Sequence, residues 1–370
     1  MRQTVVISLM ITAVALTTLI VALGGCNSSS VAPKNDGPTG SLYVLNQNDS
    51  TLYVYDAATL TRIDSVHTVV PQPHHMEFSP NHDFFYVVSR FAPGRVAKFN
   101  IADNSFVDTL KGIAGVLPTA IAVSATGDTG FITNYDVSQT TNSFIYRVNL
   151  TNMTLIDSTL QTGIRSHDIK ITHDGKQVIA ASYSSDNITV INTETFQIDI
   201  IDVDPTNPFE GSGDTLTQRP FGLAIDKNDS LLYVACPKGR QVRIFDITTS
   251  PAQYVGKIDI PVAGGYLEYE GPAQLKLTPD GKKLYVATYR ANSVVAVDVE
   301  TRKWTADIPV GTPWAFAVDV SDDGSRAYVS CVNINNGQGK VYVLDTSTDR
   351  IVDSIQVGKA SFMLHYHNHH

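Results

Sequence analysis

The sequence predicts an all-β protein in which seven four-stranded antiparallel sheets form a closed ring. Three observations support this architecture. An aromatic or aliphatic anchor recurs every 43 to 54 residues, each time in a short apolar run. A later run in each unit ends in Asp or Asn, and these endings also number seven. No run with helical spacing and caps follows the N-terminal region, which argues against an architecture of alternating strands and helices.

The segment from Gly271 to Gly311 shows the plan of one unit most clearly. It contains four short runs rich in β-branched residues, and turn residues such as Thr278-Pro279-Asp280-Gly281 separate them. The runs are apolar on alternate faces and often on both, so the sheet must be covered on two sides. A ring of four-stranded sheets covers both faces and leaves only short edges, which is the β-propeller solution.

Seven copies of this unit align on their second and third strands. The second-strand anchors are Tyr43, Tyr86, Phe131, Ile179, Tyr233, Tyr285 and Tyr328. The third strands end at Asp56, Asn100, Asn149, Asn192, Asp246, Asp298 and Asp345. An Asx side chain at such a corner accepts a hydrogen bond from backbone amides further along the chain, which favours a turn there.

The two ends of the repeat region complement each other. The first unit begins at Ser41 with what aligns as its second strand. The run from Ser361 to His365 follows the fourth strand of the seventh unit and has no unit of its own. We therefore expect this C-terminal run to supply the missing first strand and to close the ring in the N-terminal blade.

The N-terminal region has a different composition. Residues 1–25 contain Arg2 and a long apolar run, which indicates a targeting segment, and residues 26–40 are rich in Ser, Pro and Gly, which indicates a flexible tether. An uncleaved anchor helix is the alternative. The predicted division is thus a signal peptide at 1–25, a tether at 26–40 and a propeller at 41–370.

Overall composition limits the classes of partner. The chain has 370 residues, 43% of them hydrophobic, and a formal net charge of −9. Such a chain is long and apolar enough for a large core. An acidic protein without a basic cluster argues against nucleic acid as a partner.

Two resemblances follow from these motifs. Leu23-Gly24-Gly25-Cys26 resembles the lipobox of bacterial lipoproteins. This resemblance implies cleavage before Cys26, a diacylglyceryl group on its sulfur, contact with a lipid membrane and a place in the cell envelope, on the periplasmic or outer-membrane side. The runs YVLN, FITN and YVAT, with VDVETRK and IPVG, resemble the YVTN-type family of seven-bladed propellers. That family implies the fold and a binding role rather than a particular activity.

Candidate ligand-binding residues lie at the starts of the predicted innermost strands and in the loops beside them. Loops of this kind carry binding sites on rigid scaffolds, and aromatic side chains with a few cations suit a sugar, a peptide or an anionic small ligand. The candidates are His74, His75, His167, Asp168, Arg219, Phe221, Tyr266 and Trp314. The alternative is that these side chains pack between blades or are solvated.

A metal site is a second possibility at the same end of the channel. Several imidazoles that converge there would bind Cu or Zn. The candidate ligands are His74, His75, His167, His365 and His367. Our main expectation is that no metal or other cofactor is bound, and that these histidines are turn or channel residues.

The sequence contains no common catalytic signature. Motifs such as G-x-S-x-G, H-E-x-x-H, C-x-x-C and a Walker loop are missing. We therefore assign no catalytic residue and expect a binding or scaffold module for an unknown protein or small ligand. The alternative is a propeller enzyme of lactonase or oxidoreductase type, for which His167, Asp168 and Glu210 are the first acid/base candidates.

Overall fold

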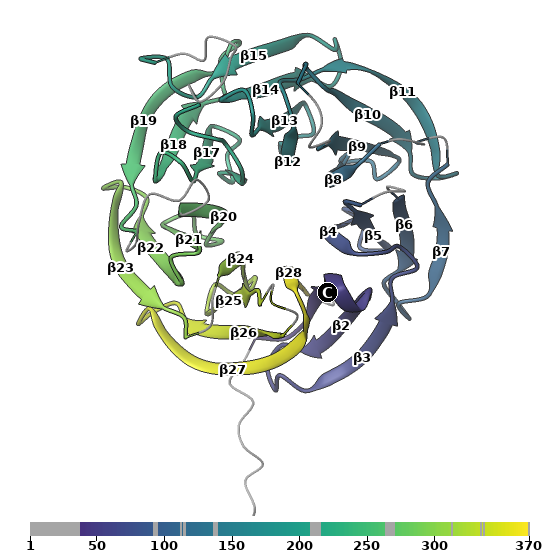
Figure 1. Cartoon of the computed structure of the whole chain (residues 1–370), viewed down its shortest axis with the longest axis vertical. Coiled ribbons are helices and arrows are strands. Elements are labelled where there is room, and N and C mark those ends of the chain that lie inside the picture. Colours follow the sequence, from purple (N-terminus) through teal and green to yellow (C-terminus); the bar gives the residue numbers. More distant parts are fainter. Residues whose placement is uncertain are drawn as a thin grey trace, which may run out of the picture. The chain divides into compact units, whose positions relative to one another are not determined.

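The computed structural model describes residues 38–91, 95–111, 113, 116–135, 140–207, 216–262, 271–311, 314–333, 335 and 337–368. These residues form seven four-stranded antiparallel sheets arranged around a central channel (Figure 1). The predicted fold class is confirmed. The predicted signal peptide and most of the tether lie outside the described residues. Within the described part of the chain, no helix has the length and apolar character needed to cross a bilayer.

The blades follow one another in chain order, and the strands of each run from the channel outwards. Blade 1 consists of β28 (Ser361–His367), β1 (Ser41–Asn46), β2 (Thr51–Asp56) and β3 (Arg62–His67), with the short 3-10 helix η1 (Gln47–Asp49) between β1 and β2. Blade 2 consists of β4 (Pro73–Phe78), β5 (Phe84–Ser89), β6 (Arg95–Asn100) and β7 (Phe106–Thr109). Blade 3 consists of β8 (Pro118–Val123), β9 (Thr129–Asn134), β10 (Phe144–Asn149) and β11 (Thr154–Gln161).

The remaining four blades repeat the same order. Blade 4 consists of β12 (Ser166–Ile171), β13 (Gln177–Ser182), β14 (Asn187–Asn192) and β15 (Ile198–Asp202). Blade 5 consists of β16 (Leu223–Ile225), β17 (Leu231–Cys236), β18 (Gln241–Asp246) and β19 (Gln253–Asp259). Blade 6 consists of β20 (Gly271–Leu277), β21 (Lys283–Tyr289), β22 (Ser293–Asp298) and β23 (Lys303–Pro309). Blade 7 consists of β24 (Ala315–Val320), β25 (Arg326–Cys331), β26 (Gln338–Asp345) and β27 (Arg350–Lys359).

The C-terminal strand closes the ring as the sequence predicts. β28 pairs antiparallel with β1, with Tyr43 opposite His365 and Ser41 opposite His367. Figure 1 shows β28 on the channel side of blade 1, next to β24 and β4. The N- and C-terminal parts of the repeat region therefore share one blade, and the ring has no open edge.

The core is distributed between the blades. Each of the seven hydrophobic clusters combines buried residues from at least two neighbouring blades. The predicted anchors belong to these clusters, and Tyr43, Tyr233 and Tyr285 are at most 2% exposed. Cys236 and Cys331 are buried in two different clusters. Each sheet is thus covered on both faces by its neighbours, which explains the apolar runs on both faces of the strands.

Six of the seven predicted Asx corners form as expected, whereas the Asn100 side chain donates a hydrogen bond to Ser105 Oγ at 2.9 Å. The Asp56 side chain accepts a hydrogen bond from the Thr59 backbone N–H at 2.7 Å, and Asp298 accepts one from Thr301 at 2.7 Å. The turn between the third and fourth strands is therefore encoded locally.

A β-bulge interrupts the innermost strand in six of the seven blades, as far as the described residues extend. In β4, for example, Pro73 pairs with Ser89 but His75 pairs with Val88, so one extra residue is inserted near the strand start. The other bulged innermost strands are β8, β12, β20, β24 and β28. A bulge re-aims side chains, and in this fold it determines which residues of each innermost strand face the channel.

Candidate functional site

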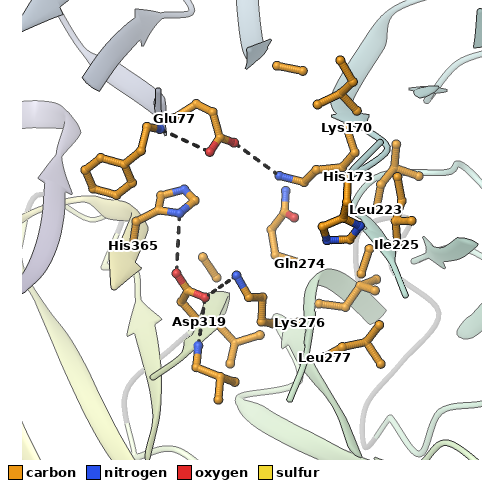
Figure 2. Close-up of a pocket in the computed structure, with 18 of the residues that line it drawn as sticks. Glu77, Lys170, His173, Leu223, Ile225, Gln274, Lys276, Leu277, Asp319 and His365 are labelled. Carbon is orange, nitrogen blue, oxygen red and sulfur yellow. Dashed lines mark hydrogen bonds and ion pairs between the residues drawn. The ribbon is translucent and has the colours of Figure 1, made fainter. Parts of the chain in front are cut away.

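A cavity lies where the innermost strands end. Residues near the C-terminal ends of all seven innermost strands line a cavity of about 690 Å³, which we call the strand-end pocket (Figure 2). This volume lies within the usual range for small-molecule sites. Charged side chains and alanines surround it. Each innermost strand contributes one of them from near its end. In order from β4 to β28 they are Glu77, Ala122, Lys170, Ala224, Lys276, Asp319 and His365.

Two ion pairs cross the pocket wall. The Lys276 Nζ lies 2.7 Å from Asp319 Oδ1, and the Lys170 Nζ lies 3.8 Å from Glu77 Oε2 (Figure 2). The His365 Nδ1 lies 3.5 Å from Asp319 Oδ2. Each pair joins side chains from different blades, and the ring closure brings His365 to the group.

Asp319 is the ionised centre of this group. Burial by itself would raise the pKa of Asp319, but Lys276 and His365 outweigh it, and the pKa lies well below the ordinary Asp range. The same attraction to Asp319 raises the pKa of Lys276 against the opposing effect of burial. Lys276 therefore stays cationic in the pocket while its side chain remains 47% exposed.

Replacing Asp319 by Asn is expected to remove an acid-sensitive contribution to stability. Because folding lowers the pKa of Asp319, its contribution is present above pH ~4 and is lost as the pH falls through the lowered pKa. Removing one partner of a buried pair costs ~3–5 kcal/mol, and we expect roughly 2 kcal/mol for this pair because Lys276 is half exposed. Urea denaturation from pH 2 to 7 measures the difference in the free energy of unfolding between wild type and D319N.

The matched control is Asp259→Asn, which removes an exposed carboxylate 3.2 Å from Lys257 on the outermost strand of blade 5. Its effect should be close to zero at every pH. A D319N difference that stays constant down to pH 2 would contradict the assignment.

A His–Asp pair stands at the rim of the pocket. The His173 Nδ1 lies 2.6 Å from Asp229 Oδ1, and the two residues belong to the turns that follow β12 and β16. Asp229 also accepts hydrogen bonds from the backbone N–H groups of His173 and Asp174, both at 2.9 Å. These bonds fix the carboxylate, which is 17% exposed, while the imidazole is 61% exposed.

Asp229 occupies a turn position where four of the other blades have glycine. Its φ is +52°, in the left-handed region where non-glycine residues are uncommon. The equivalent turn position in blades 3, 4, 6 and 7 is glycine with positive φ, namely Gly127, Gly175, Gly281 and Gly324. Asp is among the few residues that tolerate this conformation. The turn itself needs only a residue that tolerates a positive φ, which glycine supplies in those four blades. The Asp229 carboxylate is therefore not needed for the turn.

The His–Asp pair has the arrangement of a general base with its orienting group. An ionised carboxylate only accepts hydrogen bonds, so Nδ1 donates to Asp229, and in the neutral form of the imidazole Nε2 is the acceptor. Figure 2 shows His173, Lys170 and Gln274 around the same part of the pocket. The pocket thus combines a base, fixed cations and an amide, which suits hydrolysis of an ester.

The residues predicted from the sequence gather mainly at the opposite end of the channel. The imidazoles of His74 and His167 lie 5.8 Å apart, and His167 stacks on Phe221 at 3.6 Å. Arg219 lies over the Tyr183 ring at 4.9 Å, and Trp314 lies 5.5 Å from Tyr289. These side chains form an aromatic layer, and Tyr266 and Glu210 lie outside the described residues.

Burial determines the chemistry of this layer. His74 and His167 are at most 4% exposed, and burial lowers their pKa well below the ordinary His value. His75 is 2% exposed with its pKa lowered in the same way, and its ring lies 6.0 Å from that of His365. These imidazoles are therefore neutral at pH 7.

Asp168 is a buried carboxyl group on β12. It accepts hydrogen bonds from the backbone N–H groups of Ile169 and Leu223, both at 2.9 Å. Burial raises its pKa. It therefore ties blade 4 to blade 5, and it does not line the strand-end pocket.

The contacts among the five histidines considered as metal ligands are pairwise. His74 lies against His167, His75 lies near His365, and His367 hydrogen-bonds through Nε2 with His82 Nδ1 at 2.9 Å. Across the described ranges, no group of three or more His, Cys, Asp or Glu side chains has the geometry to hold a metal ion. The convergence on which the metal alternative depends is therefore not found among these five residues.

The sequence interpretation missed most of the strand-end pocket. Of the predicted site residues that the structure describes, only His365 lines it. The missed residues are Glu77, His173, Asp229, Gln274, Lys276 and Asp319. A signal was present in the repeat: the next-to-last residue of several innermost strands is charged, and Asp229 stands where four other blades have glycine.

A comparison with protein families identifies the same seven-bladed architecture. Residues 39–364 match a family described as lactonase, 7-bladed β-propeller. The chain belongs to this family. The resemblance to propeller repeats is thereby confirmed, but the family shown is the lactonase family and not the YVTN type. No curated protein matches the sequence significantly. Membership in the lactonase family favours the enzyme alternative over the non-enzymatic binding module that we expected from the sequence.

Solved structures share the fold at low identity. A periplasmic gluconolactonase of Pseudomonas aeruginosa has a TM-score of 0.70 at 18% identity and covers 88% of this chain and 98% of its own. A Bacteroides fragilis protein described as a 6-phosphogluconolactonase has a TM-score of 0.68 at 16% sequence identity. The match covers 90% of this chain and 99% of that protein. Hydrazine synthase of Kuenenia stuttgartiensis has a TM-score of 0.66 at 18% sequence identity. The match covers 88% of this chain and 100% of the hydrazine synthase chain. At these identities the likeness extends to the fold alone.

Proposed function

We propose that this member of the lactonase family hydrolyses a lactone in the strand-end pocket, with His173 as the general base. The observation that carries the proposal is the His173–Asp229 pair at 2.6 Å on the rim of a 690 Å³ cavity. The family match over residues 39–364 supplies independent support. The exposure of the imidazole leaves it accessible to water and substrate.

The proposed reaction begins with water at His173. Nε2 accepts a proton from the water as its oxygen bonds to the lactone carbonyl carbon, and Asp229 stabilises the resulting imidazolium. The tetrahedral intermediate then collapses, and the ring C–O bond breaks. The imidazolium returns the proton to the departing alkoxide oxygen, so that lactone and water give a hydroxy acid.

The cations of the pocket stabilise the negative charge that develops on the carbonyl oxygen. Lys276 is the better placed group, because Asp319 keeps it charged while its side chain remains 47% exposed. Lys170 is 29% exposed and lies on the side of His173 (Figure 2). A fixed cation in a pocket with apolar walls stabilises an oxyanion more than it would in water.

A turnover assay tests the proposal. The purified full chain is incubated with five- and six-membered lactones, and the carboxylic acid released is titrated at constant pH. We expect hydrolysis above the spontaneous rate for at least one lactone, with saturation in substrate concentration. Turnover no faster than the spontaneous rate across the panel would refute the proposal.

We also propose that the protein is exported and anchored to a membrane in the cell envelope through lipid on Cys26. The support is the sequence Leu23-Gly24-Gly25-Cys26 after a long apolar run. Wild type should label with radioactive palmitate and partition with membranes, whereas Cys26→Ser should not label. Equal labelling of both proteins would count against this proposal.

A further inference from the structure

We infer that His74, His75 and His167, which we call the channel histidines, form an acid-sensitive switch whose protonation reversibly unfolds the propeller in mild acid. The three rings belong to β4 and β12. The same two strands carry Glu77 and Lys170 of the strand-end pocket, so the pocket is lost together with the fold. The inference goes beyond the proposed function, and its main test does not depend on lactone hydrolysis.

The channel histidines are enclosed without hydrogen-bond partners. Their residues are at most 4% exposed. Both ring nitrogens of His75 and of His167, and Nδ1 of His74, are buried and have no hydrogen-bond partner among the described residues. His74 and His167 lie 5.8 Å apart, and the rings of Phe362 and Phe221 lie against them. A proton on one of these imidazoles would place a charge in a largely aromatic environment, which is costly.

The cations around the channel histidines add to the effect of burial. Burial is the main reason why the pKa of each ring lies well below the ordinary His value, and repulsion from Arg90 lowers the pKa of His74 and His167 further. Lys170 and His365 act on the third ring in the same direction. A positive charge on any of the three imidazoles is therefore opposed both by burial and by its neighbours.

The carboxylates on the surrounding innermost strands are engaged elsewhere. Asp168 accepts hydrogen bonds from two backbone N–H groups, both at 2.9 Å. Glu77 lies 3.8 Å from Lys170, and Asp319 lies 2.7 Å from Lys276. In the described part of the chain, no ion pair links one of these three carboxylates to a channel histidine. A proton taken up by a channel histidine therefore gains no compensating partner in the folded protein.

The consequence is a folded state that loses stability in mild acid. In the unfolded chain a histidine takes up a proton near pH ~6.5, whereas the channel histidines stay neutral in the folded protein to a lower pH. Unfolding therefore binds extra protons, and three such groups raise its equilibrium constant by up to ~10³-fold per pH unit below pH ~6.5. A typical domain has ~10³–10⁸ folded molecules per unfolded one, so this change offsets the native stability within ~1–3 pH units.

Urea denaturation followed by far-UV circular dichroism tests the inference. Most carboxyl groups titrate below pH ~5, so the range from pH ~6.5 to ~5 reports mainly on histidines. We expect the unfolding equilibrium constant of wild type to rise by up to ~10³-fold per pH unit at the acid end of this range. His167→Phe keeps a ring against Phe221 and should lose one of these three factors of ten. The double variant with His74→Phe should lose two.

The matched control is His67→Gln, which removes an imidazole that is exposed at the end of β3. This variant should keep the wild-type pH dependence. The comparison uses the slope of the logarithm of the unfolding constant against pH. A variant that is merely less stable shifts this line at every pH and leaves its slope unchanged, so a structural role of the rings does not imitate the result.

A fluorescence measurement detects the switch without denaturant. Trp314 lies 5.5 Å from Tyr289, whereas the second tryptophan of the chain, Trp304, is 49% exposed on β23. In Trp304→Phe protein we expect the emission of Trp314 to shift to longer wavelength below pH ~5 and to return on neutralisation. The same protein with His74→Phe and His167→Phe should keep its emission at that pH.

The outcomes separate this inference from the proposed function. Equal slopes in wild type and in the double variant, or an unchanged Trp314 emission down to pH ~4.5, would overturn the switch. Loss of lactone hydrolysis in acid with unchanged emission would also overturn it while leaving the hydrolase in place. An acid transition that the double variant lacks, in a protein that hydrolyses no lactone at neutral pH, would support the switch and refute the hydrolase.

Discussion

Ending the chain after Ala360 is expected to abolish cooperative folding, because this truncation removes β28 from blade 1. Met363, Leu364 and Tyr366 of this strand are at most 8% exposed. Burial of each such side chain contributes ~1.5–3 kcal/mol, and their sum approaches a typical net stability of ~5–15 kcal/mol. The truncation also leaves the backbone of β1 without its partner strand. Circular dichroism and thermal melting of the soluble fraction measure the result.

Two control variants test whether the effect of the truncation comes from the loss of β28. A chain that ends at Asn368 keeps all of β28 and should melt within ~2 °C of wild type. Leu364→Ala keeps the strand but removes buried methyl groups, and it should cost ~2–4 kcal/mol. A cooperative melting transition near the wild-type temperature in the chain that ends at Ala360 would show that β28 does not hold the ring closed.

Replacing His173 by Gln is expected to lower kcat for lactone hydrolysis by roughly 10²–10³-fold with little change in KM. General base catalysis contributes ~10²–10⁴-fold, and Gln retains hydrogen bonding but accepts no proton. The side chain is 61% exposed, so the substitution should leave the melting temperature close to wild type. Steady-state kinetics with a lactone that wild type hydrolyses measure the effect.

Asp229→Gly separates the role of the carboxylate from the role of the turn. Glycine occupies this left-handed position in blades 3, 4, 6 and 7, so the backbone is preserved. We expect kcat to fall at least tenfold, because the His173 imidazole loses its orienting partner. The loss of three hydrogen bonds to Asp229 should cost roughly 1–3 kcal/mol of stability.

Two other histidines serve as controls for the location of the reaction. His82 occupies the equivalent turn of blade 2 and does not line the pocket, so His82→Gln should keep kcat within ~2-fold. His167→Gln changes the aromatic layer at the other end of the channel. Activity that is lost in H167Q but kept in H173Q would place the reaction at that other end.

The candidate site could be predicted only in part. The imidazoles and Phe221 at the strand starts do come together, as His74 and His167 show at 5.8 Å. Their burial could not be read from the sequence, because it depends on how seven strands fill the channel. Nothing in the sequence connected His173 with Asp229, which lie 56 residues apart in the turns of two blades.

The architecture could be read from the sequence because the signals for it are local and repeated. Alternating apolar runs, turn residues and Asx corners such as Asp56 specify each blade within about forty residues, and the unpaired run at Ser361 specifies the closure. The end of the channel that holds the pocket, and the charges that meet there, became apparent only in the folded ring. Those contacts join separate blades, as in the ion pair of Lys276 with Asp319, and no local pattern encodes a distance between blades.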